Sequence, residues 1–111
     1  MTKYGFATLS AFVFGIGTVF LGNALAVDGD AARGDRLASS CMACHGTEGR
    51  SNMPSMYPHL AGRDAQELAD LLTAYRDGDI DEPQMTPQAQ NLSDQDIADL
   101  AVYFSEQEPA E

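Results

Sequence analysis

Apolar residues recur at helical spacing in three parts of the chain, and no part has a convincing β-strand pattern. The first part begins at Asp28 or Asp30, either of which can cap a helix, and continues through Leu37 into a turn at residues 41–44. Gly34 interrupts this segment with a residue small enough to let another helix approach closely. The fold class that these patterns predict is all-α.

The second predicted helix opens at Asp64, with Glu67 three residues later in the manner of a capping box. It ends at Asp77-Gly78, where glycine is a common helix stop. Its apolar stripe consists of Leu68, Leu71, Leu72 and Tyr75.

The last predicted helix has the clearest start, because Ser93 is a strong N-cap and Leu92 with Ile97 match a hydrophobic staple. We expect its aromatic residues to pack against the helix that carries Gly34, and residues 107–111 to fray. Its core face is formed by Ile97, Leu100, Ala101 and Phe104, with Tyr103 on the flank.

Between the first two helices, residues 46–62 hold three glycines, two prolines and several polar residues, without any periodicity. Such a loop is expected to wrap around another object and to carry binding groups. The domain outside the N-terminal segment is 85 residues long, a size at which a chain often needs a metal, a disulfide or a cofactor to complete its core.

Residues 1–26 have the pattern of a cleaved signal peptide, with Lys3 near the start and an apolar run over residues 6–21. Ala24 and Ala26 form the small-x-small site, so cleavage after Ala26 would leave a domain of residues 27–111 in the periplasm. The alternative is a retained membrane anchor, because the apolar stretch through Ala26 is just long enough to span a bilayer.

The domain is strongly acidic. All 17 acidic residues lie in residues 27–111 against five arginines, which gives a net charge of −12, and the only lysine lies in the signal segment. Such a field repels nucleic acid and anionic membrane surfaces and attracts a basic docking patch on a redox partner. Adaptation to a saline medium, where charge is screened, is the competing explanation for the acidity.

The segment 41–45 reads Cys-Met-Ala-Cys-His, which is the pattern for covalent attachment of haem. Each thiol can add to one haem vinyl group, and His45 can bind the iron from one face. A redox dithiol is an alternative, but such motifs are typically found beside a βαβ unit, and this chain has no convincing β-strand pattern. A zinc site built from Cys41, Cys44, His45 and His59 is another, although adjacent Cys and His rarely bind one tetrahedral ion.

Together these motifs resemble a bacterial class I cytochrome c, of the small monohaem periplasmic type or one half of a dihaem cytochrome c. The resemblance implies a cytochrome c fold, with three main helices and loops around one covalently bound haem c, the first and last helices crossing near Gly34 and Tyr103. The residues that carry it are residues 41–46, residues 58–62, Met85 and the segment from Asn91 to Phe104.

Met85 is the expected distal iron ligand. Met42 lies inside the attachment turn, and Met53 and Met56 follow His45 too closely to reach the opposite face. Met85 lies in a proline-flanked segment that we expect to cross the distal face as a loop, at the position of the methionine ligand in the family. His59 is the rival ligand, but we expect it to be exposed and unligated.

Other assignments around the haem are second-order expectations. The Pro54 carbonyl is a candidate acceptor for the proximal His45 ring N–H, although the alignment there also admits position 55. Arg63 is a candidate partner for a haem propionate, or a solvated surface residue. The candidate pocket walls are Tyr57, Leu60, Leu68, Leu72, Tyr75 and Leu92.

These features predict a one-electron carrier between redox proteins, with His45 and Met85 closing the iron site, and not an enzyme. The alternative is a cytochrome subunit of a larger dehydrogenase, such as flavocytochrome c sulfide dehydrogenase, so the chain is expected to be a monomer or a subunit of a redox complex. A peroxidase or gas-binding protein needs an open sixth position, which Met85 argues against. Because the haem would supply much of the core, we expect the apo-protein to be largely unfolded.

Overall fold

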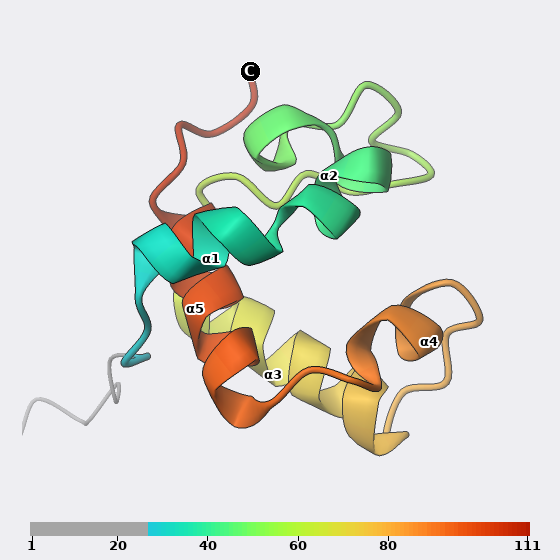
Figure 1. Cartoon of the computed structure of the whole chain (residues 1–111). Helices are drawn as coiled ribbons and strands as arrows, with labels where there is room; N and C mark the ends of the chain where they lie inside the picture. The colour runs from blue at the N-terminus through green and yellow to red at the C-terminus, as the bar shows by residue number, and fades with distance from the viewer. Residues whose placement is uncertain (1–26) are drawn as a thin grey trace, which may run out of the picture.

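A computed structural model describes residues 27–111, and within that range all the regular structure is helical (Figure 1). The predicted all-α class is confirmed. The signal peptide expected at residues 1–26 lies outside the described residues, and no helix within residues 27–111 is long and apolar enough to cross a membrane. The elements are α1 (Ala31–Leu37), α2 (Ser39–His45), the 3₁₀-helix η1 (Thr47–Gly49), α3 (Ala65–Asp77), α4 (Met85–Ala89) and α5 (Asp94–Ser105).

The first predicted helix is divided in two. Asp30 caps α1 by accepting from the amides of Ala32 and Arg33, so the cap is Asp30 and not Asp28. At Ala38 the amide donates to the Asp35 carbonyl, three residues back, which tightens the turn and separates α1 from α2.

α3 and α5 begin as their caps predict. The Asp64 carboxylate accepts from the Glu67 amide at the start of α3, and Gly78 ends that helix in the left-handed conformation with φ 83°. Ser93 caps α5 in a full capping box, in which Asp96 reaches back to the Ser93 amide.

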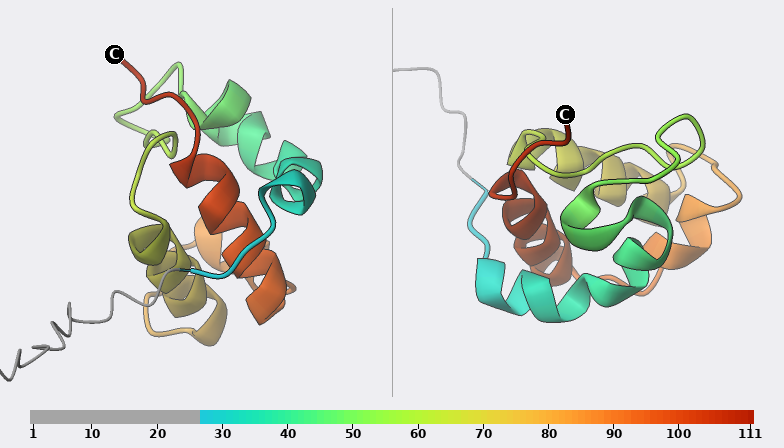
Figure 2. Two further views of the ribbon diagram at one scale, coloured as in Figure 1. Left: turned by 90° about the vertical axis from the view of Figure 1, so that its left-hand side faces the viewer. Right: turned by 90° about the horizontal axis from the view of Figure 1, so that it is seen from above.

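α5 is the central element, and it packs against both α1 and α3 (Figure 2). Its buried residues form one apolar cluster with residues of the other helices. At the crossing with α1, a Cβ built on Gly34 would lie 2.1 Å from the Asp99 carbonyl oxygen and 2.7 Å from the Tyr103 Cβ, so only glycine fits. The predicted crossing near Gly34 and Tyr103 is confirmed. The cluster consists of Ala38, Leu68, Leu100, Ala101, Tyr103 and Phe104.

The C-terminal tail does not fray as predicted. The Gln107 side chain donates to the Tyr103 carbonyl, and the Arg50 guanidinium donates to the Glu108 carbonyl at 3.1 Å. Pro109 covers Gly62, where an added Cβ would lie 2.5 Å from the proline ring. These contacts fasten the tail to the loop at residues 46–62, a long-range packing that periodicity does not reveal.

Candidate functional site

A cavity of about 850 Å³ opens between α2, α3, α4 and the loop at residues 46–62. Cys41, Cys44, His45 and Met85 all line it, so the fold brings together the four residues singled out in the sequence. The remaining walls are mostly apolar. All six predicted wall residues line the cavity: Tyr57, Leu60, Leu68, Leu72, Tyr75 and Leu92.

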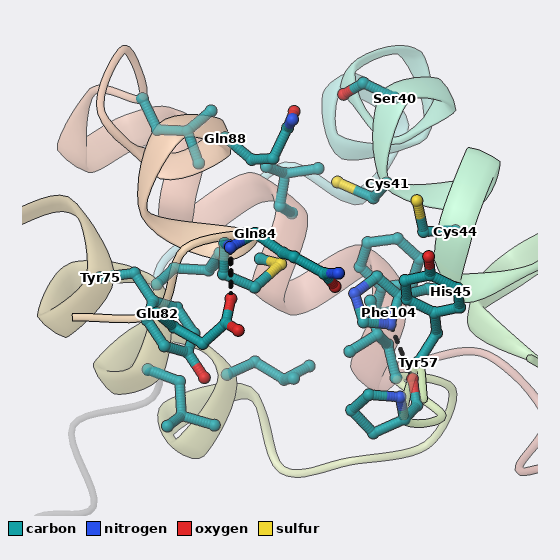
Figure 3. Close-up of a pocket in the computed structure, with 18 of the residues that line it drawn as sticks. Ser40, Cys41, Cys44, His45, Tyr57, Tyr75, Glu82, Gln84, Gln88 and Phe104 are labelled. Atoms are coloured by element: carbon teal, nitrogen blue, oxygen red, sulfur yellow. Dashed lines mark hydrogen bonds between the residues drawn. The ribbon is translucent and has the colours of Figure 1, made fainter. Parts of the chain in front are cut away.

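The two cysteines lie at one rim of the cavity, three residues apart on α2 (Figure 3). Neither cysteine is in a disulfide; Cys41 is half-buried and Cys44 is exposed. Burial raises the pKa of the Cys41 thiol. The two thiols lie one helical turn apart on an open rim. Both can therefore react with a single large molecule that carries two electrophilic groups and enters the cavity.

His45 ends α2 and is 7% exposed. Its Nδ1 lies 2.7 Å from the Pro58 carbonyl oxygen, and that acceptor requires a proton on Nδ1 (Figure 3). The other ring nitrogen, Nε2, is therefore the one available to a metal. The Tyr57 ring meets the imidazole edge-on, with centroids 6.3 Å apart.

The acceptor predicted at Pro54 is therefore wrong. Pro54 is exposed, inside a turn in which the amides of Met56 and Tyr57 donate to the Met53 carbonyl. That turn reverses the chain, and the first carbonyl to come back toward His45 is that of Pro58.

Met85 is the first residue of α4 and is half-buried at the cavity wall. The predicted loop here contains a short helix, because the Glu82 side chain accepts from the amides of Gln84 and Met85 and stabilises its first turn. Of the other described methionines, Met56 reaches the cavity but is 60% exposed, whereas Met42 and Met53 lie outside it.

His59 does not line the cavity. Its Nδ1 accepts a hydrogen bond from the Ser51 amide at 2.9 Å, and the residue is half-buried, so the expectation of an exposed side chain is wrong. The zinc alternative gains no support, since no group of three or more His, Cys, Asp or Glu within residues 27–111 is arranged to hold a metal ion.

Arg63 lies just before α3, lines the cavity and forms an ion pair with Glu67 in the first turn of that helix. Phe104 also lines the cavity, whereas the sequence favoured helix packing over a cofactor wall for both aromatic residues. Tyr103 has the packing role, against Gly34. The signal for Phe104 was present, because it lies one turn beyond Leu100 and Ala101, which share the cavity wall.

Three polar residues near Met85 share this wall and were not predicted from the sequence. They are Glu82, Gln84 and Gln88.

Together, two thiols at one rim, an imidazole with a free Nε2, a thioether and apolar walls fit one haem c. This combination of helical fold and donor set defines a c-type cytochrome. The family model described as cytochrome c oxidase, cbb3-type, subunit III matches residues 29–104, and the chain belongs to this cytochrome c family. Its cofactor is a single covalently attached haem c, and it acts in electron transfer.

Similar proteins agree with this class. Cytochrome c-554(548) of Halomonas halodenitrificans is 49% identical over 83 residues, which cover 72% of this chain and 99% of that protein. Cytochrome c4 of Pseudomonas aeruginosa is 44% identical over 79 residues, 71% of this chain but 39% of that protein. The crystal structure of reduced cytochrome c4 from Pseudomonas stutzeri matches with a TM-score of 0.68 and 36% identity over 72% of this chain and 46% of that one. The chain thus spans nearly all of the first relative and less than half of the cytochromes c4.

Proposed function

We propose that this protein is a periplasmic one-electron carrier in which Cys41 and Cys44 form the thioether bonds and His45 and Met85 bind the iron. The observation that carries the proposal is the common cavity: all four side chains line it, and the Pro58 carbonyl fixes the His45 proton on Nδ1. When bound, the haem gains and loses a single electron.

The residues of the chain have separate tasks in this mechanism. His45 presents Nε2 to the iron, and its hydrogen bond from Nδ1 to the Pro58 carbonyl holds the orientation of the ring. A methionine sulfur favours reduced iron relative to a second histidine, so a potential above that of a bis-histidine cytochrome is expected. The apolar walls would exclude water from the bound haem, and the exposed rim at Cys44 is where a redox partner would exchange electrons with it.

The optical spectrum of the ferric holoprotein tests the ligand assignment. The wild type should show the sulfur-to-iron charge-transfer band, and Met85→Ala should lose it. Met56→Ala is the matched control, since Met56 is the other described methionine on the cavity wall, and it should keep the band. A wild type without the band, or a band that survives Met85→Ala, would overturn the assignment.

Export to the periplasm rests on residues 1–26, and mature protein beginning at Val27 by mass spectrometry is the expected result. A freely diffusing carrier is favoured over a dehydrogenase subunit, because the match covers 99% of cytochrome c-554(548), whose name describes a cytochrome and not a subunit of a larger enzyme. The charge of −12 over residues 27–111 supports a redox partner with a basic docking patch. The transfer rate to such a partner should then fall as salt is raised, whereas a flat response would assign the acidity to the medium.

A further inference from the structure

Glu82 lies three residues before Met85, and its carboxylate accepts a hydrogen bond from the Met85 amide. Its Oε2 accepts from the Met85 amide at 2.7 Å and from the Gln84 amide at 2.8 Å. Figure 3 shows the bond between Glu82 and Gln84. Glu82 also lines the cavity, and it is half-buried there. One carboxylate oxygen therefore joins the cavity wall to the backbone of the residue that is proposed to bind the iron.

Thr86 forms two further hydrogen bonds with Glu82. We call the hydrogen bonds of Glu82 to Gln84, Met85 and Thr86 the Glu82 brace. The Glu82 amide donates to Thr86 Oγ1 at 3.1 Å, and the Thr86 amide donates to the Glu82 carbonyl at 2.9 Å. The Thr86 hydroxyl also donates to the Ile80 carbonyl at 3.4 Å. Residues on both sides of Met85 are thus bonded to Glu82, and the position of Met85 depends on that residue.

The brace is needed because α4 has five residues, too few to be stable from its own hydrogen bonds. Gln84 stands at the N-cap without a side-chain cap of its own, and Pro83 has no amide to donate. The Glu82 carboxylate supplies the missing acceptor. Hydrogen bonds to an ionised acceptor are about twice as strong as those between neutral groups.

We propose that Glu82 is a positioning residue that holds Met85 against the cavity and so limits displacement of its sulfur by outside ligands. The inference rests on the proposed function, specifically on Met85 as an iron ligand. Loss of the brace frees the first turn of α4, and a competing ligand then has less binding energy to overcome.

Imidazole binding to the ferric holoprotein, followed by loss of the charge-transfer band, tests the role. Glu82→Ala should raise the affinity for imidazole about tenfold, since two charge-assisted hydrogen bonds to the first turn of α4 are lost. Glu82→Gln keeps an oxygen acceptor without the charge and should fall between Glu82→Ala and wild type. If Glu82→Ala does not yield folded holoprotein, Glu82→Gln carries the test.

Asp81→Asn is the matched control. Asp81 is the neighbouring acid, it is exposed, and its side chain makes none of the hydrogen bonds found within residues 27–111. This variant removes the same charge and should keep wild-type affinity for imidazole. A purely structural role for Glu82 would lower the denaturant midpoint without changing the imidazole affinity of the folded protein.

The two possible failures differ in their spectra. A wild type without the charge-transfer band would overturn Met85 as a ligand. A wild type with the band, and Glu82 variants that bind imidazole as the wild type does, would overturn the inference about Glu82 alone. An affinity that rises equally in Asp81→Asn would also overturn it, because charge rather than the brace would then be the cause.

Discussion

The hydrogen bond between His45 and Pro58 is the residue-scale feature on which the site depends. It fixes the tautomer of His45 and the direction of its ring, and therefore which nitrogen of the proposed iron ligand faces the cavity. The acceptor is a backbone carbonyl, so its position depends on the path of the loop. His59, the next residue, accepts from the Ser51 amide at 2.9 Å and so links two segments within that loop.

Replacing His59 should therefore loosen the loop without touching the cavity. His59→Leu leaves the amide of the buried Ser51 without its acceptor and should lower the unfolding free energy by about 1–3 kcal/mol. His59→Asn places a carbonyl oxygen near the position of Nδ1 and should recover most of the loss. Denaturant unfolding of the ferric wild-type, His59→Leu and His59→Asn holoproteins measures these differences. A His59→Leu protein as stable as the wild type would show that the hydrogen bond to Ser51 does not stabilise the loop.

At the residue scale, the side chains of the site could be predicted from the sequence. The backbone groups that hydrogen-bond to them could not. Cys41, Cys44, His45 and Met85 were predicted together and line one cavity. Pro58 was missed as the acceptor for His45, because a carbonyl is present at every residue and only the turn at residues 53–57 decides which one returns.

At the scale of elements, the crossing of α1 over α5 positions α2, because α2 follows α1 directly in the chain. Gly34→Ala would place a methyl group 2.1 Å from the Asp99 carbonyl oxygen, so the two helices must separate. Overpacking of this kind costs about 1–3 kcal/mol and outweighs the gain in helix propensity.

Gly78→Ala is a useful comparison, since no atom lies within 4 Å of the added carbon, although φ is 83°. That variant should lose about 1 kcal/mol through backbone strain alone. Thermal or denaturant unfolding of both holoproteins checks the ranking, and a Gly34→Ala protein as stable as the wild type would rule out tight contact at the crossing.

Asp99 links the same two helices electrostatically. It is 0% exposed and accepts from the Asp30 amide at 2.7 Å and from Arg33 at 2.6 Å. The Asp30 amide and then the Arg33 guanidinium hold the pKa of Asp99 below its ordinary value. A lowered folded pKa adds stability above the unfolded pKa of about 3.9, and that stability is lost as the pH falls through the folded pKa.

Asp99→Asn should thus be less stable by about 2–3 kcal/mol at neutral pH, and it should lose less stability than the wild type below about pH 4. Denaturant unfolding of the ferric holoprotein between pH 7 and acid conditions measures both effects. Asp70→Asn, which alters an exposed carboxylate on α3, should follow the wild-type curve. If the stability of Asp99→Asn fell with pH in parallel with that of the wild type, the lowered pKa of Asp99 would not be a source of stability.

The helices themselves were predicted where side chains cap them. Asp30, Asp64 and Ser93 each begin a helix as their sequence positions indicate. The break at Ala38, the short helix α4 and the anchored tail were missed. The tail depends on a distant part of the fold, through the bond from Arg50 to Glu108. The break at Ala38 and the start of α4 depend on local hydrogen bonds to Asp35 and Glu82, which neither the apolar spacing nor a standard N-cap residue indicates.

For the whole molecule, charge is distributed unevenly. Four of the five arginines form ion pairs with acidic residues, so most positive charge is already matched within the domain. Residues 37–62 contain one acid and one base, Glu48 and Arg50, and these are paired with each other at 3.0 Å. The excess of acid therefore lies in the segments outside this one, and the rim with Cys44 adds little to it.

The size of the cavity relative to the domain makes folding dependent on the haem. The cavity of about 850 Å³ is open and lined mostly by apolar side chains of α2, α3, α4 and α5. Without the haem these side chains would face water or collapse onto one another, and a domain of 85 residues has little other apolar surface to bury.

A Cys41→Ala, Cys44→Ala double variant made without haem should therefore be largely unfolded. Circular dichroism should show a large loss of helix, and limited proteolysis should cut within α3 and α4, because their apolar faces lose the group between them. Residual structure should concentrate at the crossing of α1 and α5, where Gly34, Tyr103 and Asp99 make contacts that do not involve the cavity wall. An apo-protein with native helix content and a cooperative thermal transition would show instead that α5 and its neighbours form a sufficient core, and that the haem enters a fold already made.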